Sequence, residues 1–226
     1  MSDDSAFDGR ARLFPLPNLV CFPQVVQPLH IFEPRYRAMT ADALAGDKRI
    51  ALVMPKPGWE EDYDGRPAVH RVACLGKIVA EQKLDDGRFN LLLRGTHRIR
   101  ILEELDTGTS FRVARVRMLE DQPLTHPGKE AIYRNQLVKL APAHFPHAGP
   151  VREEFRKLLA GPLPIGALAD IVAFALGLDA AFKQELLEEL NVGVRACKLI
   201  ERLGSKPEPI DPEVSSRKFP PEFSAN

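Results

Sequence analysis

The chain has 226 residues, of which 44% are hydrophobic, and its 31 basic side chains equal its 31 acidic ones. This composition excludes a wholly disordered chain and lacks the positive excess of a general nucleic-acid binder. No apolar run reaches about 18 residues, and the acidic start is unlike a signal peptide, so no membrane segment is expected. Cys21, Cys74 and Cys197 lie far apart, which fits reduced thiols and a cytoplasmic protein.

Residues 11–122 are predicted to form a β-rich lobe. Its apolar or alternating runs lie at 11–16, 27–32, 50–54, 72–84, 88–94, 98–101 and 111–118. Asp86-Gly87 between two of these runs is typical of a hairpin turn. In the last run the alternation slips at Val113-Ala114, which predicts a β-bulge there. One helix interrupts the strands, beginning at Pro34 and ending before Gly46.

From residue 123 to 204 the apolar residues recur at helical spacing, which predicts a small helical bundle. Asp179 and Asn191 are suited to cap two of its helices. Residues 1–10 are expected to be a disordered end. Residues 205–226 hold five of the 20 prolines and are expected to be a tail without regular structure. The predicted fold class is therefore α+β, with strands first and helices second.

Motifs for catalysis and cofactor binding are missing. Neither Gly-Lys pair has the further glycine and the Ser or Thr of a Walker A loop. Ser110 is the only serine outside the two ends of the chain, and Cys74 lies in an apolar run typical of a buried thiol. His144-x-x-His147 has the spacing of a metal pair, but the intervening Pro146 favours a loop. We therefore expect no enzymatic activity and no catalytic, cofactor-binding or metal-binding residues.

Two stretches have the composition of contact surfaces. The loop at 55–67 carries Trp59 and Tyr63, whose rings either contact a peptide or fold back onto the β-rich lobe. A basic stretch from Arg94 to Arg117, which includes Arg98, either contacts RNA or an acidic partner or forms the polar face of antiparallel strands. The zero net charge favours the polar face, so nucleic acid is not expected as the ligand.

The segment LFPLPNLVCFPQVVQPLHIFEPRYRAM at 13–39 resembles the start of the N-terminal, substrate-binding domain of Lon proteases. Similar residues follow at 74–78, 86–88, 91–98 and 183–195, so the resemblance covers about 11–203. It implies a twisted β-barrel lobe of PUA-like type followed by a helical bundle. In that family an ATPase module and a Ser–Lys peptidase module follow this domain. We expect neither activity in this chain.

The resemblance implies a non-enzymatic module that binds unfolded or extended polypeptide, as an adaptor or chaperone-like factor in protein quality control. A protease or ATPase encoded elsewhere is a further implied partner. The motif residues either pack strand against helix or line a binding groove between the lobes. The predicted polypeptide-binding residues are Phe32, Glu33, Arg35, Tyr36, Trp59, Tyr63, Arg94 and Arg98. An RNA-binding PUA-like protein and an enzyme with an unrecognised site are the alternatives.

Overall fold

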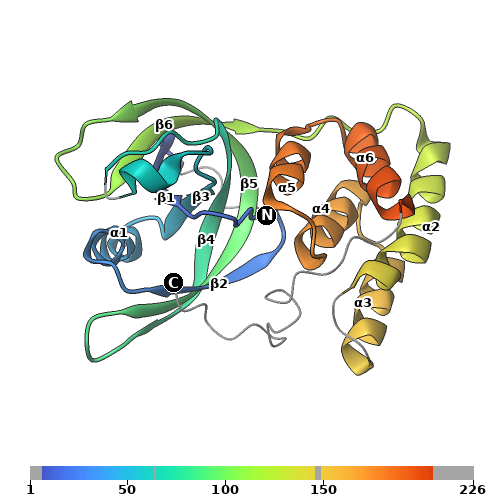
Figure 1. The fold of residues 1–226 in the computed structure, drawn as a ribbon, viewed down its shortest axis with the longest axis horizontal. Coiled ribbons are helices and arrows are strands. Elements are labelled where there is room, and N and C mark those ends of the chain that lie inside the picture. The colour runs from blue at the N-terminus through green and yellow to red at the C-terminus, as the bar shows by residue number, and fades with distance from the viewer. Residues whose placement is uncertain (1–6, 64, 146–148, 206–226) are drawn as a thin grey trace. The chain divides into compact units, whose positions relative to one another are not determined.

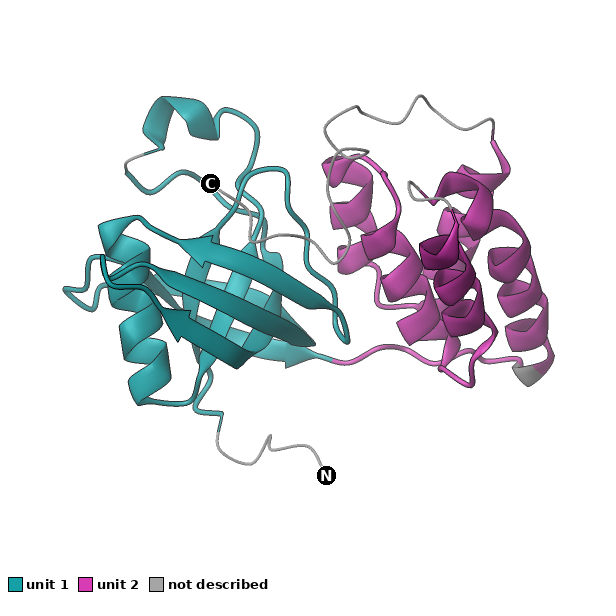
Figure 2. Ribbon diagram, turned by 90° about the horizontal axis from the view of Figure 1, so that it is seen from below, with its two compact units in different colours: residues 1–119, 223–226 teal, residues 120–222 magenta. Residues whose placement is uncertain are grey.

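The computed structural model describes residues 7–63, 65–145 and 149–205. This part of the chain divides into two compact units, residues 7–119 and 120–205 (Figures 1 and 2). Unit 1 holds a six-stranded mixed sheet and unit 2 is helical, so the protein is α+β as predicted. Of the ends expected to be irregular, 1–6 and 206–226 lie outside the described residues. Phe7 packs against the core of unit 1.

The strands of unit 1 are β1 (Arg10–Pro15), β2 (Val26–Ile31), β3 (Arg49–Val53), β4 (Val72–Lys83), β5 (Phe89–Leu105) and β6 (Arg112–Leu119). They are joined by helix α1 (Pro34–Ala45) and the short 3₁₀ helix η2 (Trp59–Asp62). The strand order is β2-β5-β4-β3-β1-β6, with β1 and β3 parallel and the other neighbours antiparallel. Because β6 also pairs with β5, every strand except β2 has at least two neighbours. Pro28, which has no N–H to donate, accordingly lies in β2 at the edge of the sheet.

Strand β5 joins two runs that the sequence analysis treated as separate, 88–94 and 98–101. Its first part pairs with β2 and its second part with β6. Gly95 lies where these two parts meet, and a Cβ atom there would come within 2.1 Å of the Phe22 carbonyl oxygen. The strand can therefore continue past Phe22 only because this position has no side chain.

The sequence predicted a bulge at Val113-Ala114 in β6, and this prediction is wrong, because the bulge lies in the adjacent strand β5. The β5–β6 ladder shifts register between Ile101 and Glu103, which leaves Leu102 as the extra residue and 47% exposed. By contrast, β6 pairs with β1 in unbroken register. The alternation of apolar residues changes phase in β6, and β5 accommodates this change with one extra residue. One inserted residue has this effect because it reverses the faces of a strand.

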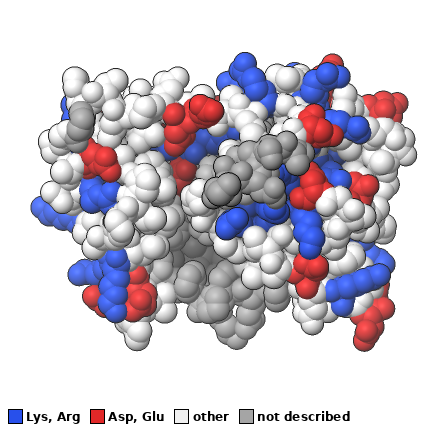
Figure 3. Space-filling view, turned by 180° about the vertical axis from the view of Figure 1, so that it is seen from behind, with Lys and Arg blue, Asp and Glu red and all other residues white. Residues whose placement is uncertain are grey.

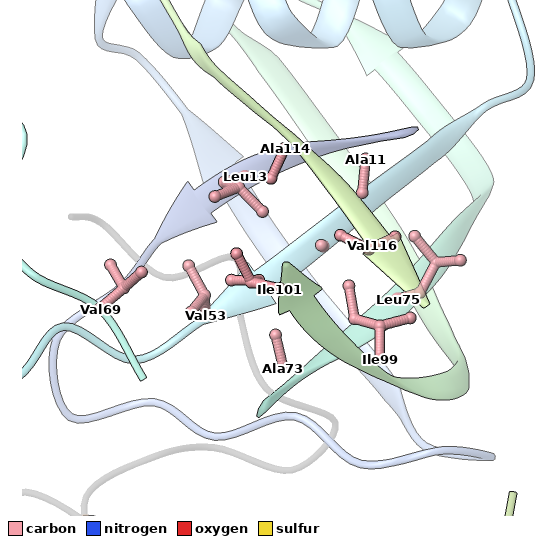
Figure 4. Packing of buried hydrophobic residues seen from close by; sticks show 11 residues of the cluster. Ala11, Leu13, Val53, Val69, Ala73, Leu75, Ile99, Ile101, Ala114 and Val116 are labelled. Atoms are coloured by element: carbon pink, nitrogen blue, oxygen red, sulfur yellow. The ribbon is translucent and has the colours of Figure 1, made fainter. Parts of the chain in front are cut away.

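A core of unit 1 consists of small and branched apolar side chains from β1, β3, β4, β5, β6 and the segment before β4, and they point toward one another (Figure 4). They are Ala11, Leu13, Ala51, Val53, Val69, Ala73, Leu75, Ile99, Ile101, Ala114 and Val116. Helix α1 contacts β1, β2 and β3 and buries Tyr36, Met39 and Ala43. The start of this helix is thereby held against the sheet.

Unit 2 contains α2 (Pro127–His144), α3 (Pro150–Ala160), α4 (Ile165–Ala175), α5 (Ala180–Glu188) and α6 (Val192–Gly204). Helix α2 contacts α3, α4 and α6, and α4 also contacts α5 and α6. Both predicted caps are confirmed: the Phe182 amide donates to Asp179 at 2.7 Å and the Val194 amide to Asn191 at 3.1 Å. Among the described helices, none combines the length and the apolar character needed to cross a membrane.

His144 does not lie in a loop, as the sequence analysis expected. It is the last residue of α2, and its Nε2 lies 2.8 Å from the Leu203 carbonyl oxygen. Pro146 constrains the backbone of the residue before it, and Phe145 is indeed extended, so the helix reaches to His144. His147 lies outside the described residues.

The segment 120–122, which the sequence analysis assigned to the β-rich lobe, belongs to unit 2. The Gln122 amide donates to the Leu190 carbonyl at 2.8 Å, and the Val192 amide donates to the Gln122 carbonyl at 3.1 Å. Arg195, only 1% exposed, donates to both oxygens of Asp121 at 3.0 and 2.5 Å. Its Nε also lies 3.2 Å from the buried Asp170 carboxylate. These contacts attach the segment to α6 although it follows β6 directly.

Candidate functional site

The loop at 55–67, between β3 and β4, is closed at its base by backbone hydrogen bonds. The Lys56 amide donates to the Ala68 carbonyl at 2.8 Å, and the His70 amide donates to the Met54 carbonyl at 3.0 Å. Gly58 has a φ of +87°, which turns the chain into η2 at Trp59. The loop is therefore a folded element that holds Trp59 and Tyr63 in place.

Three polar residues attach this loop to the start of α1. The Tyr63 hydroxyl donates to Glu33 Oε1 at 2.7 Å, and Arg35 Nε donates to Glu33 Oε2 at 2.9 Å. The terminal nitrogens of Arg35 also donate to the Tyr63 carbonyl at 3.3 and 3.2 Å. The Arg35 guanidinium lies 4.7 Å from the ring centre of Tyr36 and 5.2 Å from that of Tyr63. Stacking and hydrogen bonding thus fix this arginine between helix and loop.

A cavity of about 230 Å³ lies beside this attachment. It is lined by Pro15, Pro17, Arg35, Tyr36, Pro55, Trp59, Tyr63, Gly65, Arg66, Pro67, Ser110, Phe111 and Arg112. Four of these residues are aromatic, four are prolines and three are arginines. The rings of Trp59 and Tyr63 meet edge to face with centres 5.7 Å apart. The walls are therefore mostly rigid rings, with cationic groups between them.

Arg112, which also lines the cavity, is fixed by hydrogen bonds to Glu104 and to the end of the loop. Its Nε and Nη2 donate to the two oxygens of Glu104 at 2.9 and 2.5 Å, and its Nη1 donates to the Pro67 carbonyl at 2.9 Å. Such a two-point contact with a carboxylate fixes the plane of the guanidinium. Strand β6 is thereby connected to the end of the loop at Pro67.

Both tyrosines of the cavity stay protonated at neutral pH. Burial raises the pKa of Tyr36 to about 12. Burial and the hydrogen bond to Glu33 raise the pKa of Tyr63. Partial burial lowers the pKa of Arg35, but its neighbours Tyr36, Glu33 and Tyr63 offset this and leave that pKa raised. The cavity therefore presents neutral rings, hydroxyl groups and guanidinium N–H donors.

One serine, Ser110, is among the described residues that line the cavity. The described lining holds no threonine, cysteine, His, Asp or Glu with this serine. A serine needs such a base to be activated. Across the described residues, no group of three or more His, Cys, Asp or Glu side chains is placed to hold a metal ion.

Four of the eight predicted site residues line this cavity, namely Arg35, Tyr36, Trp59 and Tyr63, and Glu33 holds two of them. The other three lie elsewhere. Phe32 is 40% exposed beside His30, so it does not pack strand against helix as one reading of the motif expected. Arg94 is exposed on β5, and Arg98, further along the same strand, is 3% exposed opposite Cys74.

The sequence analysis missed Arg66, Arg112, Phe111 and the four prolines as site residues. Pro15 ends β1 and Pro55 follows β3, and these two strands are parallel neighbours. Their carboxyl ends therefore meet at one edge of the sheet, which brings the two prolines together. Prolines at the ends of apolar runs were visible in the sequence, but the parallel pairing that unites them was not.

The basic stretch is divided between buried and exposed positions. Arg112 and Arg98 are buried, and the exposed Arg115 pairs with Glu103 on the adjacent strand at 2.8 Å. On the face shown in Figure 3, basic and acidic side chains are interspersed. These positions support the interpretation as the polar face of antiparallel strands.

Unit 2 has a second cavity of about 400 Å³, lined by residues of α2 and α6 and of the segments that precede these helices. Lys129, Tyr133, Cys197 and Lys198 are among its lining residues. The side-chain hydrogen bond with Cys197 raises the pKa of Tyr133. None of the predicted site residues lies here.

The chain matches the family model described as "ATP-dependent protease La (LON) substrate-binding domain" over residues 10–204. It is 30% identical over 196 residues to a Lon protease of Dictyoglomus thermophilum, which covers 83% of this chain and 23% of that protein. The chain thus spans less than a quarter of the length of this curated relative.

Solved structures show the same fold. The N-terminal domain of Mycobacterium avium complex Lon protease superposes with a TM-score of 0.68 at 18% identity, covering 87% of this chain and 98% of that one. A Lon N-terminal domain protein from Xanthomonas campestris has a TM-score of 0.62 at 21% identity, covering 85% and 97% of the two chains.

Proposed function

The chain belongs to the Lon substrate-binding domain family, and from this membership we propose that it is a non-enzymatic module that binds unfolded or extended polypeptide. The observation that carries the proposal is the ring-lined cavity at loop 55–67, which we name the Trp59 cavity. We further propose that the protein acts as an adaptor or chaperone-like factor in protein quality control, with a protease or ATPase as partner.

The size and walls of the Trp59 cavity support this role. A volume of about 230 Å³ is below the range typical of small-molecule sites and suits one or two side chains of a passing chain. Aromatic side chains with few rotatable bonds provide contact area at little entropic cost, and the prolines are already rigid. The geometry favours a short extended segment over a folded surface.

The proposal that the protein is not an enzyme is supported by the described lining of this cavity, where Ser110 lies with arginines but with no His, Asp or Glu that could act as its base. The family match is to a substrate-binding domain. Proteolysis by the longer relatives is therefore not assigned to this chain.

We also infer the finer architecture that the family implies, a PUA-like barrel followed by a helical bundle. The pairing of β6 with both β1 and β5, and a core shared by five strands, support the barrel. The contacts of α2 and α4 with their neighbours support the bundle. A cytoplasmic location is part of the proposal, because Cys21, Cys74 and Cys197 are free thiols.

The test uses a small protein held unfolded by reduction and alkylation of its disulfides, compared with its native form. Isothermal titration calorimetry measures the affinity of the parent chain and of each variant, because replacing Trp59, the only tryptophan, removes the intrinsic fluorescence signal of the cavity. We expect binding of the unfolded form alone, and at least about a tenfold loss of affinity for Trp59→Ala, as for an aromatic anchor.

Phe32→Ala is the matched control, since Phe32 is an exposed ring outside the cavity. We expect this variant to bind like the parent. Equal binding of both protein forms, or of neither, would overturn the proposed function. If Trp59→Ala binds the unfolded protein as tightly as the parent does, the Trp59 cavity is not the binding site.

A further inference from the structure

We propose that the segment bound in the Trp59 cavity is proline-containing and acidic, an extended chain in which prolines and carboxylates alternate. This inference rests on the proposed function of the same cavity and names the class of polypeptide that it selects. Three properties of the lining carry it: its hydrogen-bonding groups, its rings and its charge.

The polar side chains of the lining are mainly donors. The Trp59 indole N–H and the Arg66 guanidinium have no hydrogen-bond partner among the described residues, and both line the cavity. The two loop carbonyls that accept side-chain hydrogen bonds here, those of Tyr63 and Pro67, already accept from Arg35 and Arg112. Among the residues that the structure describes, no carboxylate lines the cavity. The complementary ligand therefore presents acceptors and few N–H groups.

A proline-containing segment meets this requirement. Proline has no backbone N–H, so its burial leaves no donor without a partner. The polyproline II conformation has no internal hydrogen bonds and leaves its carbonyl oxygens free to accept. An ordinary extended peptide would instead bring an N–H at every residue into a cavity whose polar side chains are mainly donors.

The rings of the lining suit the same ligand. Grooves that recognise polyproline II segments are lined by aromatic side chains between which the proline rings pack. The Trp59 and Tyr63 rings meet edge to face in this cavity. The Tyr36 ring packs against the Phe14 ring, with the two ring centres 4.4 Å apart. The ligand is also stiff before it binds, which reduces the entropy lost on binding.

The positive charge of the three lining arginines favours a ligand that carries carboxylates. Arg35 and Arg112 are paired with Glu33 and Glu104, which do not line the cavity themselves. Arg66 has no ion pair within the described part of the chain, although its backbone amide donates to Asp62. Glu60, Glu61 and Asp62 of η2 are exposed and do not line the cavity. A ligand carboxylate would therefore find Arg66 as its two-point partner.

The test measures fluorescence anisotropy of three labelled nonapeptides with the full chain. The first alternates proline and glutamate, the second proline and lysine, and the third alanine and glutamate. We expect the proline–glutamate peptide to bind at least about tenfold more tightly than either of the others. Equal binding of the proline–glutamate and alanine–glutamate peptides would overturn the part played by proline.

Arg66→Gln separates a specific contact from general charge. We expect it to weaken binding of the proline–glutamate peptide about tenfold and to remove the preference over the proline–lysine peptide. Arg94→Gln, the same change at an exposed arginine outside the cavity, should leave both affinities unchanged. An equal effect of the two variants would overturn the role of Arg66.

Binding of the unfolded test protein and binding of the peptides distinguish failure of the proposed function from failure of this inference. Binding of the unfolded test protein without preference for the proline–glutamate peptide would overturn this inference and leave the proposed function standing. Failure of the unfolded protein and of all three peptides to bind would overturn both.

Discussion

The Tyr63 hydroxyl donates a hydrogen bond to Oε1 of Glu33 at 2.7 Å, and this contact joins the loop at 55–67 to the residue that precedes α1. The two residues are 30 positions apart. Arg35 completes the arrangement, because it donates to the carboxylate of Glu33 and to the backbone carbonyl of Tyr63. One side of the Trp59 cavity therefore depends on a small polar cluster rather than on apolar packing.

Replacing Tyr63 with phenylalanine removes only the hydroxyl of this cluster. We expect the free energy of unfolding to fall by about 0.5–1.5 kcal/mol, as is usual for one lost hydrogen bond. We also expect the amide protons of residues 55–67 to exchange faster with solvent, because the loop loses one of its attachments to α1. Hydrogen exchange measured by mass spectrometry checks this, and unchanged exchange in the loop would contradict it.

Burial of Tyr36 gives the protein a distinct tyrosine titration. The ultraviolet absorbance of tyrosinate should show one transition near pH 12, where the raised pKa of Tyr36 lies, whereas the unfolded chain titrates near the ordinary value of 10.0. Between these two values the unfolded state holds fewer protons than the folded state, so the free energy of unfolding falls as the pH rises. Below pH 10 this contribution is fully present.

The control for this titration is Tyr36→Phe. It should abolish the transition near pH 12 and reduce the fall of stability with pH above 10, to which Tyr63 and Tyr133, whose pKa values are also raised, still contribute. A transition near 12 that persists in this variant would assign it to another tyrosine.

Replacing Arg195 with alanine should be among the most damaging changes in unit 2. The side chain is buried, and its removal leaves the buried Asp170 carboxylate without this cation and frees Asp121. Breaking a buried pair in this way costs about 3–5 kcal/mol. Denaturant unfolding monitored by circular dichroism measures the loss.

Arg202→Ala is the matched comparison, because the Arg202–Asp179 pair at 2.9 Å lies at the surface. Its loss should be no more than about 1 kcal/mol. Equal losses for the two variants would show that the Arg195 cluster adds little to stability.

Adding a single methyl group at Gly95 should destabilise unit 1. The Cβ of Gly95→Ala would meet the Phe22 carbonyl oxygen at 2.1 Å and Cys74 Sγ at 3.0 Å, and a backbone atom cannot rotate away as a side chain can. We expect a loss of about 1–3 kcal/mol or more. Thermal unfolding checks it.

At Gly128 the same substitution meets open space, with no atom within 4 Å, in the first turn of α2. Gly128→Ala should leave stability unchanged or raise it by up to about 1 kcal/mol, since alanine is the better helix former. A stable Gly95→Ala variant would refute the close approach of Phe22.

The sequence by itself predicted most of the elements and their ends. Alternation indicated the strands, helical spacing indicated the helices after residue 123, and Asp179 and Asn191 marked two helix starts that the structure confirms. The motif at 13–39 also indicated the family. All of these signals depend on residues close together in the chain, whose periodicity and capping follow from local geometry.

Only the tertiary structure decided which of these residues share a site. It brought Trp59 and Tyr63 to Arg35 and Tyr36 and added Arg66, Arg112 and four prolines. It left Phe32, Arg94 and Arg98 outside. It also placed the extra residue of the β5–β6 ladder at Leu102. The reason is that parallel pairing and loop attachment join residues about 30 or more positions apart, and the register of two strands depends on how their side chains pack, which no local pattern encodes.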